Sequence, residues 1–104
     1  MITDEVCVKY SNKFRRKKKK DKLYVYVKNG RNYKDNMVFI EGDAESLEFL
    51  GNLLLAKSIE EDEYGSQIGP RVVGSIFFNR DSTHNLYIYR IPPQEEESDV
   101  KIKR

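Results

Sequence analysis

The chain has 104 residues, of which 38% are hydrophobic and 35% are charged, and its formal net charge is +2. This length allows one domain with a modest core, with or without a tail, and leaves no room for several domains. The charges are unevenly divided, with 12 Lys and Arg against 4 Asp and Glu in residues 1–40, and 7 against 13 in residues 41–104. The two halves can therefore attract each other within the fold, or each can face a partner of opposite charge.

The number of cysteines and the lengths of the apolar segments indicate in which cellular compartment the protein is expected. Cys7 is the only cysteine, so an internal disulfide is excluded. The first residues, MITDEVCV, carry acids and no long apolar run, so we expect no signal peptide. The longest apolar block, LLLA, is too short to span a bilayer. These features favour a soluble, cytoplasmic protein without membrane contact.

Three strands are predicted before the middle of the chain. Residues 5–10, EVCVKY, alternate in polarity and indicate a first strand. A run of cations follows, namely Arg15, Arg16, Lys17, Lys18, Lys19 and Lys20. Because like charges repel one another, we expect residues 14–22 to form an extended basic hairpin tip. Residues 22–28, KLYVYVK, and 37–41, MVFIE, indicate the second and third strands, with a turn at Asn29-Gly30 between them.

A change to helical spacing follows the third strand. Asp43 is a good N-cap, and the sequence from Ala44 to about Glu60 predicts a helix. One apolar face of this helix carries Leu47, Leu50 and Leu54. A second apolar stripe comprises Phe49, Leu53 and Ala56. A helix lying on a sheet needs only one stripe, so the second must be covered by the same chain or by another copy in a homodimer.

The remainder of the chain predicts a loop, a hairpin and a tail. Acids, glycines and a proline mark a loop at residues 60–71, and VVGSIFFN and NLYIYRI indicate a terminal hairpin. Residues 1–91 should form a single α+β domain, and residues 92–104 a mobile charged tail. The predicted order is β-β-β-α-β-β, in a single mainly antiparallel sheet with one helix packed on one face. The residues expected between helix and sheet are Val25, Val27, Phe39, Leu47, Leu50, Leu54, Ile76, Phe78, Leu86 and Ile88.

Alternation in two of the strands predicts a tyrosine-rich sheet face opposite the helix. Its members are Tyr24, Tyr26, Tyr87 and Tyr89. Such a face can simply be solvated, and it can also bind a protein partner, because tyrosine supplies contact area at low entropic cost. Together with the cations of residues 15–20 it could instead bind single-stranded nucleic acid by stacking and phosphate neutralisation. The acidic remainder of the chain weakens that third interpretation.

An acid cluster is predicted at the C-terminal end of the helix. It consists of Glu60, Glu61, Asp62 and Glu63. The helix dipole disfavours anions at this end, so cations of the chain or of a basic partner should compensate them. The cationic run has three corresponding interpretations: a solvated turn, a contact for an acidic protein, and a nucleic-acid contact.

The residues that catalysis requires are scarce. His84 is the only histidine, and with the single Cys7 it makes neither a zinc site nor a convincing catalytic pair. GSQIGP has two glycines but lacks the lysine and the following helix of a phosphate-binding loop. We therefore expect a protein that is not an enzyme and that needs no cofactor or metal.

Three segments between residues 37 and 91 resemble a family of small predicted immunity proteins of bacterial polymorphic toxin systems. The segments are MVFIEGDAESLEFLGNLLLAKS, GSIFF and NLYIYRI. They give a strand, a Gly-Asp turn, a leucine-rich helix and a terminal hairpin, and the lysine-rich N-terminal part lies outside the resemblance. The resemblance implies inhibition of a cognate toxin by tight binding. By exposure, the candidate contacts for such a protein partner are the four tyrosines, or the acid cluster if the toxin is basic.

Overall fold

The computed structural model describes residues 2–28, 36–60 and 65–92 of the chain. Its architecture is α+β, with two α-helices, two two-stranded antiparallel sheets and two short 3₁₀ helices in the described residues. In chain order the elements are α1 (Ile2–Arg15), η1 (Lys19–Asp21), β1 (Tyr24–Lys28), β2 (Met37–Glu41), α2 (Ala44–Ile59), β3 (Ser66–Ile68), η3 (Ser75–Phe77) and β4 (Leu86–Ile88). The α+β class is confirmed, whereas the prediction of one continuous sheet covered by one helix is wrong.

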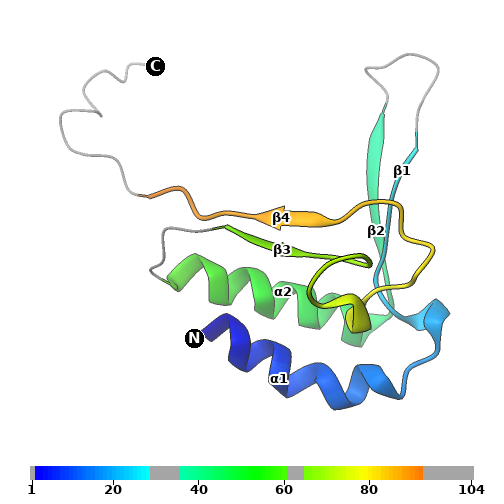
Figure 1. Cartoon of the computed structure of the whole chain (residues 1–104), viewed down its shortest axis with the longest axis horizontal. Helices are drawn as coiled ribbons and strands as arrows, with labels where there is room; N and C mark the ends of the chain where they lie inside the picture. The colour runs from blue at the N-terminus through cyan, green and yellow to red at the C-terminus, as the bar shows by residue number, and fades with distance from the viewer. Residues whose placement is uncertain (1, 29–35, 61–64, 93–104) are drawn as a thin grey trace.

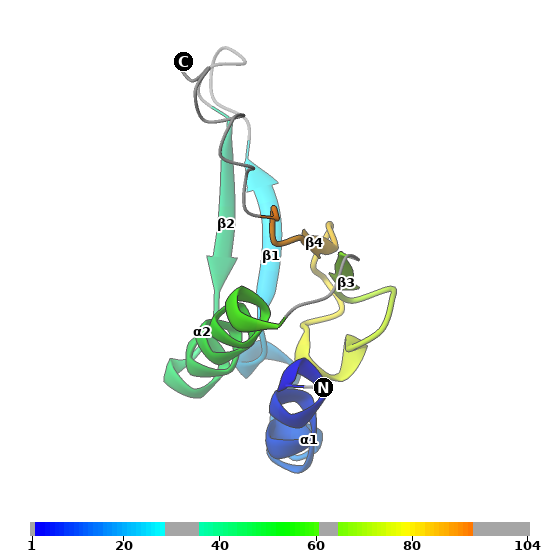
Figure 2. The same ribbon diagram turned by 90° about the vertical axis from the view of Figure 1, so that its left-hand side faces the viewer.

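The elements form a helical base from which one hairpin projects. The two α-helices lie side by side (Figure 1). The β3–β4 sheet meets the end of α2, where the Lys57 ammonium donates to the Ser66 hydroxyl of β3 at 3.3 Å. The β1–β2 hairpin rises away from both helices, at a steep angle to β4 (Figure 1). The same arrangement is visible from the side, where β1 and β2 extend well beyond α2 (Figure 2).

The first element is a helix, so the strand predicted at residues 5–10 is wrong. The alternation of Val6, Val8 and Tyr10 matched a strand, but Val6, Tyr10 and Phe14 also follow one another at the four-residue spacing of a helix face. Tyr10 and Phe14 are buried, whereas Val8 is 72% exposed. Residues 14–22 hold the end of α1 and then η1, and not the expected basic hairpin tip.

Helix α2 has the predicted position but a different buried face. The Asp43 carboxylate accepts a hydrogen bond of 2.8 Å from the Ser46 backbone amide, which confirms the N-cap. The stripe that was expected to need a second neighbour is buried within the chain, because α1 packs against α2. Its residues are Phe49, Leu53 and Ala56. A homodimer through that stripe is therefore ruled out for this fold. Leu47 and Leu54, expected inside, are exposed.

The core is an aromatic cluster between the two helices and η3. The ring centroids of Phe49 and Phe77 are 4.1 Å apart, and those of Phe14 and Phe77 are 5.0 Å apart. Tyr10 lies 5.4 Å from Phe49 and accepts a hydrogen bond of 2.8 Å from the Asn52 side chain. Of the residues predicted between helix and sheet, three are buried: Val25, Leu50 and Phe78. Three others pack against the core while partly exposed: Ile76, Leu86 and Ile88.

The segment 72–79, predicted as a strand, forms η3 instead. Gly74 has a φ of +86°, a left-handed conformation that interrupts an extended chain. Phe77 and Phe78 are consecutive and both buried, an arrangement that does not fit a strand covered on only one of its faces. The partner of β4 is instead β3, from the segment predicted as a loop, in the register Ser66↔Ile88 to Ile68↔Leu86.

Candidate functional site

The projecting hairpin is the part of the fold that is least explained by the core. We call residues Tyr24–Lys28 and Met37–Glu41 the β1–β2 arm. Its strands pair antiparallel from Tyr24↔Glu41 to Lys28↔Met37. An isolated two-stranded hairpin is at best marginally stable in water, so its position depends on what holds its base.

The base of the arm is fixed to the body by hydrogen bonds along the outer edge of β1. The backbone amide of Asn79 donates to the carbonyl of Leu23 at 2.6 Å, and that of Thr83 donates to the carbonyl of Val25 at 2.9 Å. The buried Ser82 hydroxyl accepts a hydrogen bond of 3.0 Å from the Val25 amide. In the described part of the chain no such partner continues along this edge past Val25. The arm is therefore anchored at its base and free above it.

One face of the arm carries a column of aromatic rings. The ring centroids of Tyr24 and Tyr26 are 4.5 Å apart, and Tyr26 stacks on Phe39 at 4.8 Å with an interplanar angle of 4°. The Tyr26 hydroxyl donates a hydrogen bond of 2.8 Å to the Glu41 carboxylate, and this bond raises the pKa of the phenol above its ordinary value. Stacking and this hydrogen bond hold the rings in place, so the face presents a preordered aromatic surface.

The opposite face of the arm is aliphatic and exposed. Val27 pairs with Val38 and Val25 pairs with Ile40, so these four side chains share one face of the ribbon. Val25 is buried at the base, whereas Val27, Val38 and Ile40 are 37%, 63% and 40% exposed. An exposed run of β-branched side chains on a free ribbon is typical of an interaction surface. Val27 and Phe39 were both predicted to face the helix, and neither is buried there.

The four predicted tyrosines do not share one face. Tyr24 and Tyr26 lie on the arm, while Tyr87 lies on β4 in the other sheet, followed by Tyr89. The rings of Tyr87 and Tyr89 are exposed and stack on each other with centroids 6.5 Å apart. The prediction of a single tyrosine face failed because it assumed that β1 and β4 belong to one sheet.

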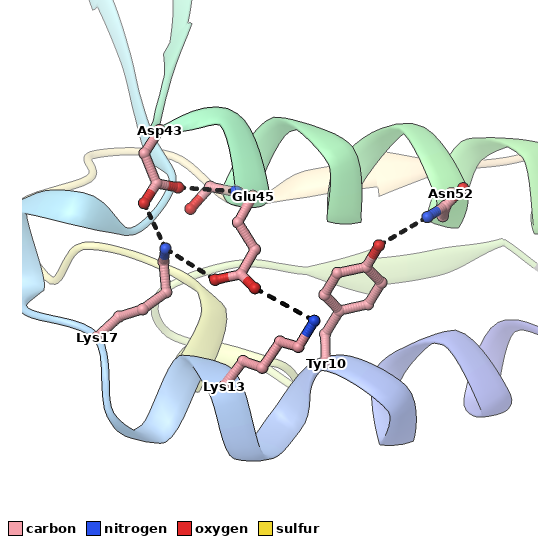
Figure 3. A network of polar contacts seen from close by, with 7 residues as sticks. Tyr10, Lys13, Lys17, Asp43, Glu45 and Asn52 are labelled. Atoms are coloured by element: carbon pink, nitrogen blue, oxygen red, sulfur yellow. Dashed lines mark hydrogen bonds and ion pairs between the residues drawn. The ribbon is translucent and has the colours of Figure 1, made fainter.

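One lysine of the cationic run, Lys17, makes side-chain contacts within the fold. Lys17 hydrogen-bonds the carboxylates of Asp43 and Glu45 at the start of α2, the latter at 3.2 Å (Figure 3). Lys13 of α1 lies 3.5 Å from Glu45 as well (Figure 3). Burial alone would lower the pKa of Lys17, but the hydrogen bonds that its ammonium donates to Asp43 and Glu45 outweigh burial and raise that pKa. The hydrogen bond from Lys17 lowers the pKa of the Asp43 carboxyl. The uneven charge of the chain is thus partly used to join α1 to α2.

The other cations of the run lie on the surface around η1. Arg15 donates a hydrogen bond of 3.2 Å to the Asn12 side chain, and Lys19 forms an ion pair of 3.2 Å with Asp81. Arg16, Lys18 and Lys20 are exposed. Lys17 therefore contacts the start of α2, whereas the other five cations of the run are exposed.

The predicted acid cluster is divided too. Glu60 is buried, and its carboxylate accepts hydrogen bonds from the Thr3 hydroxyl at 2.5 Å and from the Thr3 amide at 3.3 Å. The partial positive charge at the start of α1 thus compensates an anion at the end of α2. Glu60 is therefore not available as an exposed partner contact. Glu61, Asp62 and Glu63 lie outside the described residues.

A half-open cavity of about 300 Å³ lies between the start of α1, the end of α2 and the β3–β4 hairpin. Cys7 and Lys57 both line it, and the Lys57 ammonium donates to the Ser66 hydroxyl at 3.3 Å. Burial, together with the nearby charge of Asp4, raises the pKa of the Cys7 thiol. A protonated thiol is a poor nucleophile, so the cavity lacks an activated cysteine.

No family model, curated protein or solved structure matches the chain. Among the described residues, no group of three or more His, Cys, Asp or Glu side chains is placed to hold a metal ion. None of the described helices is long and apolar enough to cross a bilayer. The arrangement of the described residues is therefore the evidence on which a functional proposal must rest.

Proposed function

We propose that this chain is a non-catalytic protein-binding module and that its partner docks on the β1–β2 arm. The observation that carries the proposal is the exposure of Val27, Val38 and Ile40 on one face of a ribbon whose anchoring hydrogen bonds, among the described residues, lie at its base. Covering these side chains would gain the hydrophobic free energy that the free chain forgoes, about 25 cal/mol for each Å² of apolar surface removed from water. The preordered aromatic column on the other face adds contact area at low entropic cost.

The partner class that we favour is a toxin domain, with this chain as its immunity protein. The resemblance described above covers β2, one strand of the arm, and α2, which is separated from β2 by two residues. An arm with an open edge and apolar side chains suits docking by strand addition or insertion into an apolar groove. Inhibition by occlusion requires tight binding only, and it needs no reacting group on this chain.

Capture from a lysate of the source organism tests the proposal. The baits are the unchanged chain, an arm variant Val38→Lys/Ile40→Lys, and a control Leu55→Lys/Ile59→Lys that places two lysines on exposed positions of α2. We expect a protein that the unchanged chain and the control retain and that the arm variant loses by at least about tenfold, because two buried charges without partners cost several kcal/mol. Quantitative mass spectrometry of the eluates measures the ratio.

Two results would contradict the proposal. The first is a captured protein that all three baits retain equally, which would place the interface elsewhere on the chain. The second is a stable homo-oligomer of the unchanged chain that the arm variant converts to monomer, as measured by light scattering. That result would make a second copy the occupant of the arm.

The alternative function is single-stranded nucleic-acid binding, and the half-exposed stack of Tyr26 on Phe39 is the observation in its favour. Bases stack on such rings without strong sequence preference. Engagement of Lys17 by two carboxylates removes one of the six cations that this function would use. Titration with a single-stranded oligonucleotide, compared with a nucleoside monophosphate, tests this alternative.

A further inference from the structure

A polar hollow of about 600 Å³ lies beside η1, on the side of the loop that follows η3. It is formed by η1, by Lys22 directly after it, and by residues between 70 and 80. The polar and charged side chains that line the hollow are Lys19, Lys22, Ser75 and Arg80, and Ile76 and Phe78 belong to its apolar lining. The backbone here is well fixed, because Leu23 and Phe78 form a parallel bridge and the Leu23 amide donates to the Phe77 carbonyl at 3.1 Å.

The charge in this hollow is unbalanced. Three of its lining side chains are cations, and no carboxylate is among the described residues that line it. Within the part of the chain that the structure describes, neither Lys22 nor Arg80 forms an ion pair. Asp81 lies beside the hollow and pairs with Lys19 at 3.2 Å, and both side chains of that pair are mostly exposed. Burial, and then the charge of Arg80, lower the pKa of Lys22.

The surroundings of Lys22 and Arg80 differ from those of Lys17. The fold supplies two carboxylates to Lys17 at the joint between α1 and α2. Among the described residues it supplies none to Lys22 and Arg80. Both side chains line the hollow, Lys22 half-buried and Arg80 exposed, and an anion bound between these like charges would reduce their mutual repulsion.

We propose that this hollow binds the phosphate group of a small phosphorylated ligand. A phosphate dianion matches two or three nearby cations in charge. The planar guanidinium of Arg80 can donate two parallel hydrogen bonds, Lys22 acts as a point charge, and the Ser75 hydroxyl can donate to a third oxygen. This site uses no residue of the β1–β2 arm, so it is independent of the proposed protein partner.

Calorimetric and NMR titrations at constant ionic strength test the site. The ligands are inorganic phosphate, a nucleoside monophosphate and a single-stranded oligonucleotide, with sodium chloride as the blank. The variants are Lys22→Met and Arg80→Met, and the matched control is Lys9→Met, which removes an exposed charge from α1. We expect inorganic phosphate and the monophosphate to shift the amides of Lys22, Ser75 and Arg80. Each site variant should weaken binding by about tenfold, the value of one charge-assisted hydrogen bond, and the control should stay within about twofold.

A thermal scan measures the melting temperature and distinguishes a variant that has lost the phosphate site from one that has misfolded. Phosphate should raise the melting temperature of the unchanged chain, as any ligand of the folded state does. Arg80→Met should not lower the melting temperature in chloride, because it removes a like-charge repulsion, and it should abolish the rise with phosphate. A misfolded variant would instead melt lower in both salts, and Lys22→Met then supplies the same comparison.

Three outcomes would overturn the inference. One is binding of phosphate no tighter than chloride. Another is equal weakening by Lys9→Met, which would indicate diffuse attraction to the whole surface. The third is an oligonucleotide that binds far more tightly than the monophosphate, with an affinity that grows with its length. That result would assign the cations to a nucleic-acid backbone and support the alternative function.

Discussion

Replacing Phe49 with alanine is expected to lower the free energy of unfolding by about 3–5 kcal/mol, the range for truncating a buried phenylalanine. Phe49 is fully buried and its ring lies 4.1 Å from Phe77 and 5.4 Å from both Tyr10 and Phe14. Its removal leaves a cavity that borders α1, α2 and η3 at once. Small domains are stable by about 5–15 kcal/mol, so this single change should consume a large part of the total.

Urea denaturation followed by circular dichroism measures this effect. The matched control is Leu55→Ala on the same helix, because Leu55 is 66% exposed and its truncation should change stability by no more than about 0.5 kcal/mol. If the Phe49→Ala variant lost less than about 1 kcal/mol, the aromatic cluster would not be the core of the fold.

Replacing Val8 with proline should destabilise the chain by about 3 kcal/mol or more, because proline in a helix interior removes a hydrogen bond and clashes with the preceding turn. Val8 occupies the middle of the 14-residue helix α1, and its side chain is 72% exposed. The substitution therefore changes the backbone while leaving the packing of the core untouched, and α1 covers the buried stripe of α2.

The control for this change is Val8→Ala, which should leave stability unchanged or raise it slightly, since alanine has the higher helix propensity. The same denaturation experiment reports both variants. The opposite pattern, a tolerated proline and a destabilising alanine, is typical of an edge strand. It would restore the strand that the alternation of residues 5–10 predicts.

The elements that the sequence predicted correctly are those with local and unambiguous signals. Helix α2 has a capping aspartate and a long apolar run, and Asp43 caps it in the structure. β1 and β2 lie where two short β-branched and aromatic segments predicted strands, while the turn signal at Asn29-Gly30 lies outside the described residues. Such features depend on neighbouring residues alone, so they are visible without knowledge of the tertiary structure.

The elements that the sequence did not predict depend on contacts between distant residues. Val6, Val8 and Tyr10 fit a strand, whereas Val6, Tyr10 and Phe14 fit a helix face, and the choice is made when Tyr10 and Phe14 pack against Phe49. Likewise, Phe77 and Phe78 lie in an apolar run that favours a strand. The left-handed Gly74 and the burial of both rings produce η3 instead.

The candidate site was predicted in part. Alternation placed Tyr24 and Tyr26 together, and the structure confirms that they are adjacent. The aliphatic face was missed because Val27 was assigned to a sheet covered by the helix. One signal was present in the sequence: Met37 to Ile40 are four consecutive apolar residues, so both faces of that strand carry apolar side chains. On this ribbon, Val38 and Ile40 remain 63% and 40% exposed, so the described residues do not bury its aliphatic face.

The most direct test of the central claim is amide hydrogen exchange, measured on the chain alone and on its complex with the protein captured above. If the β1–β2 arm is the docking surface, exchange at Val27, Val38 and Ile40 should slow by at least about tenfold in the complex, while the exposed face of α2 stays unchanged. Protection confined to the helices, with unchanged exchange along the arm, would contradict the account.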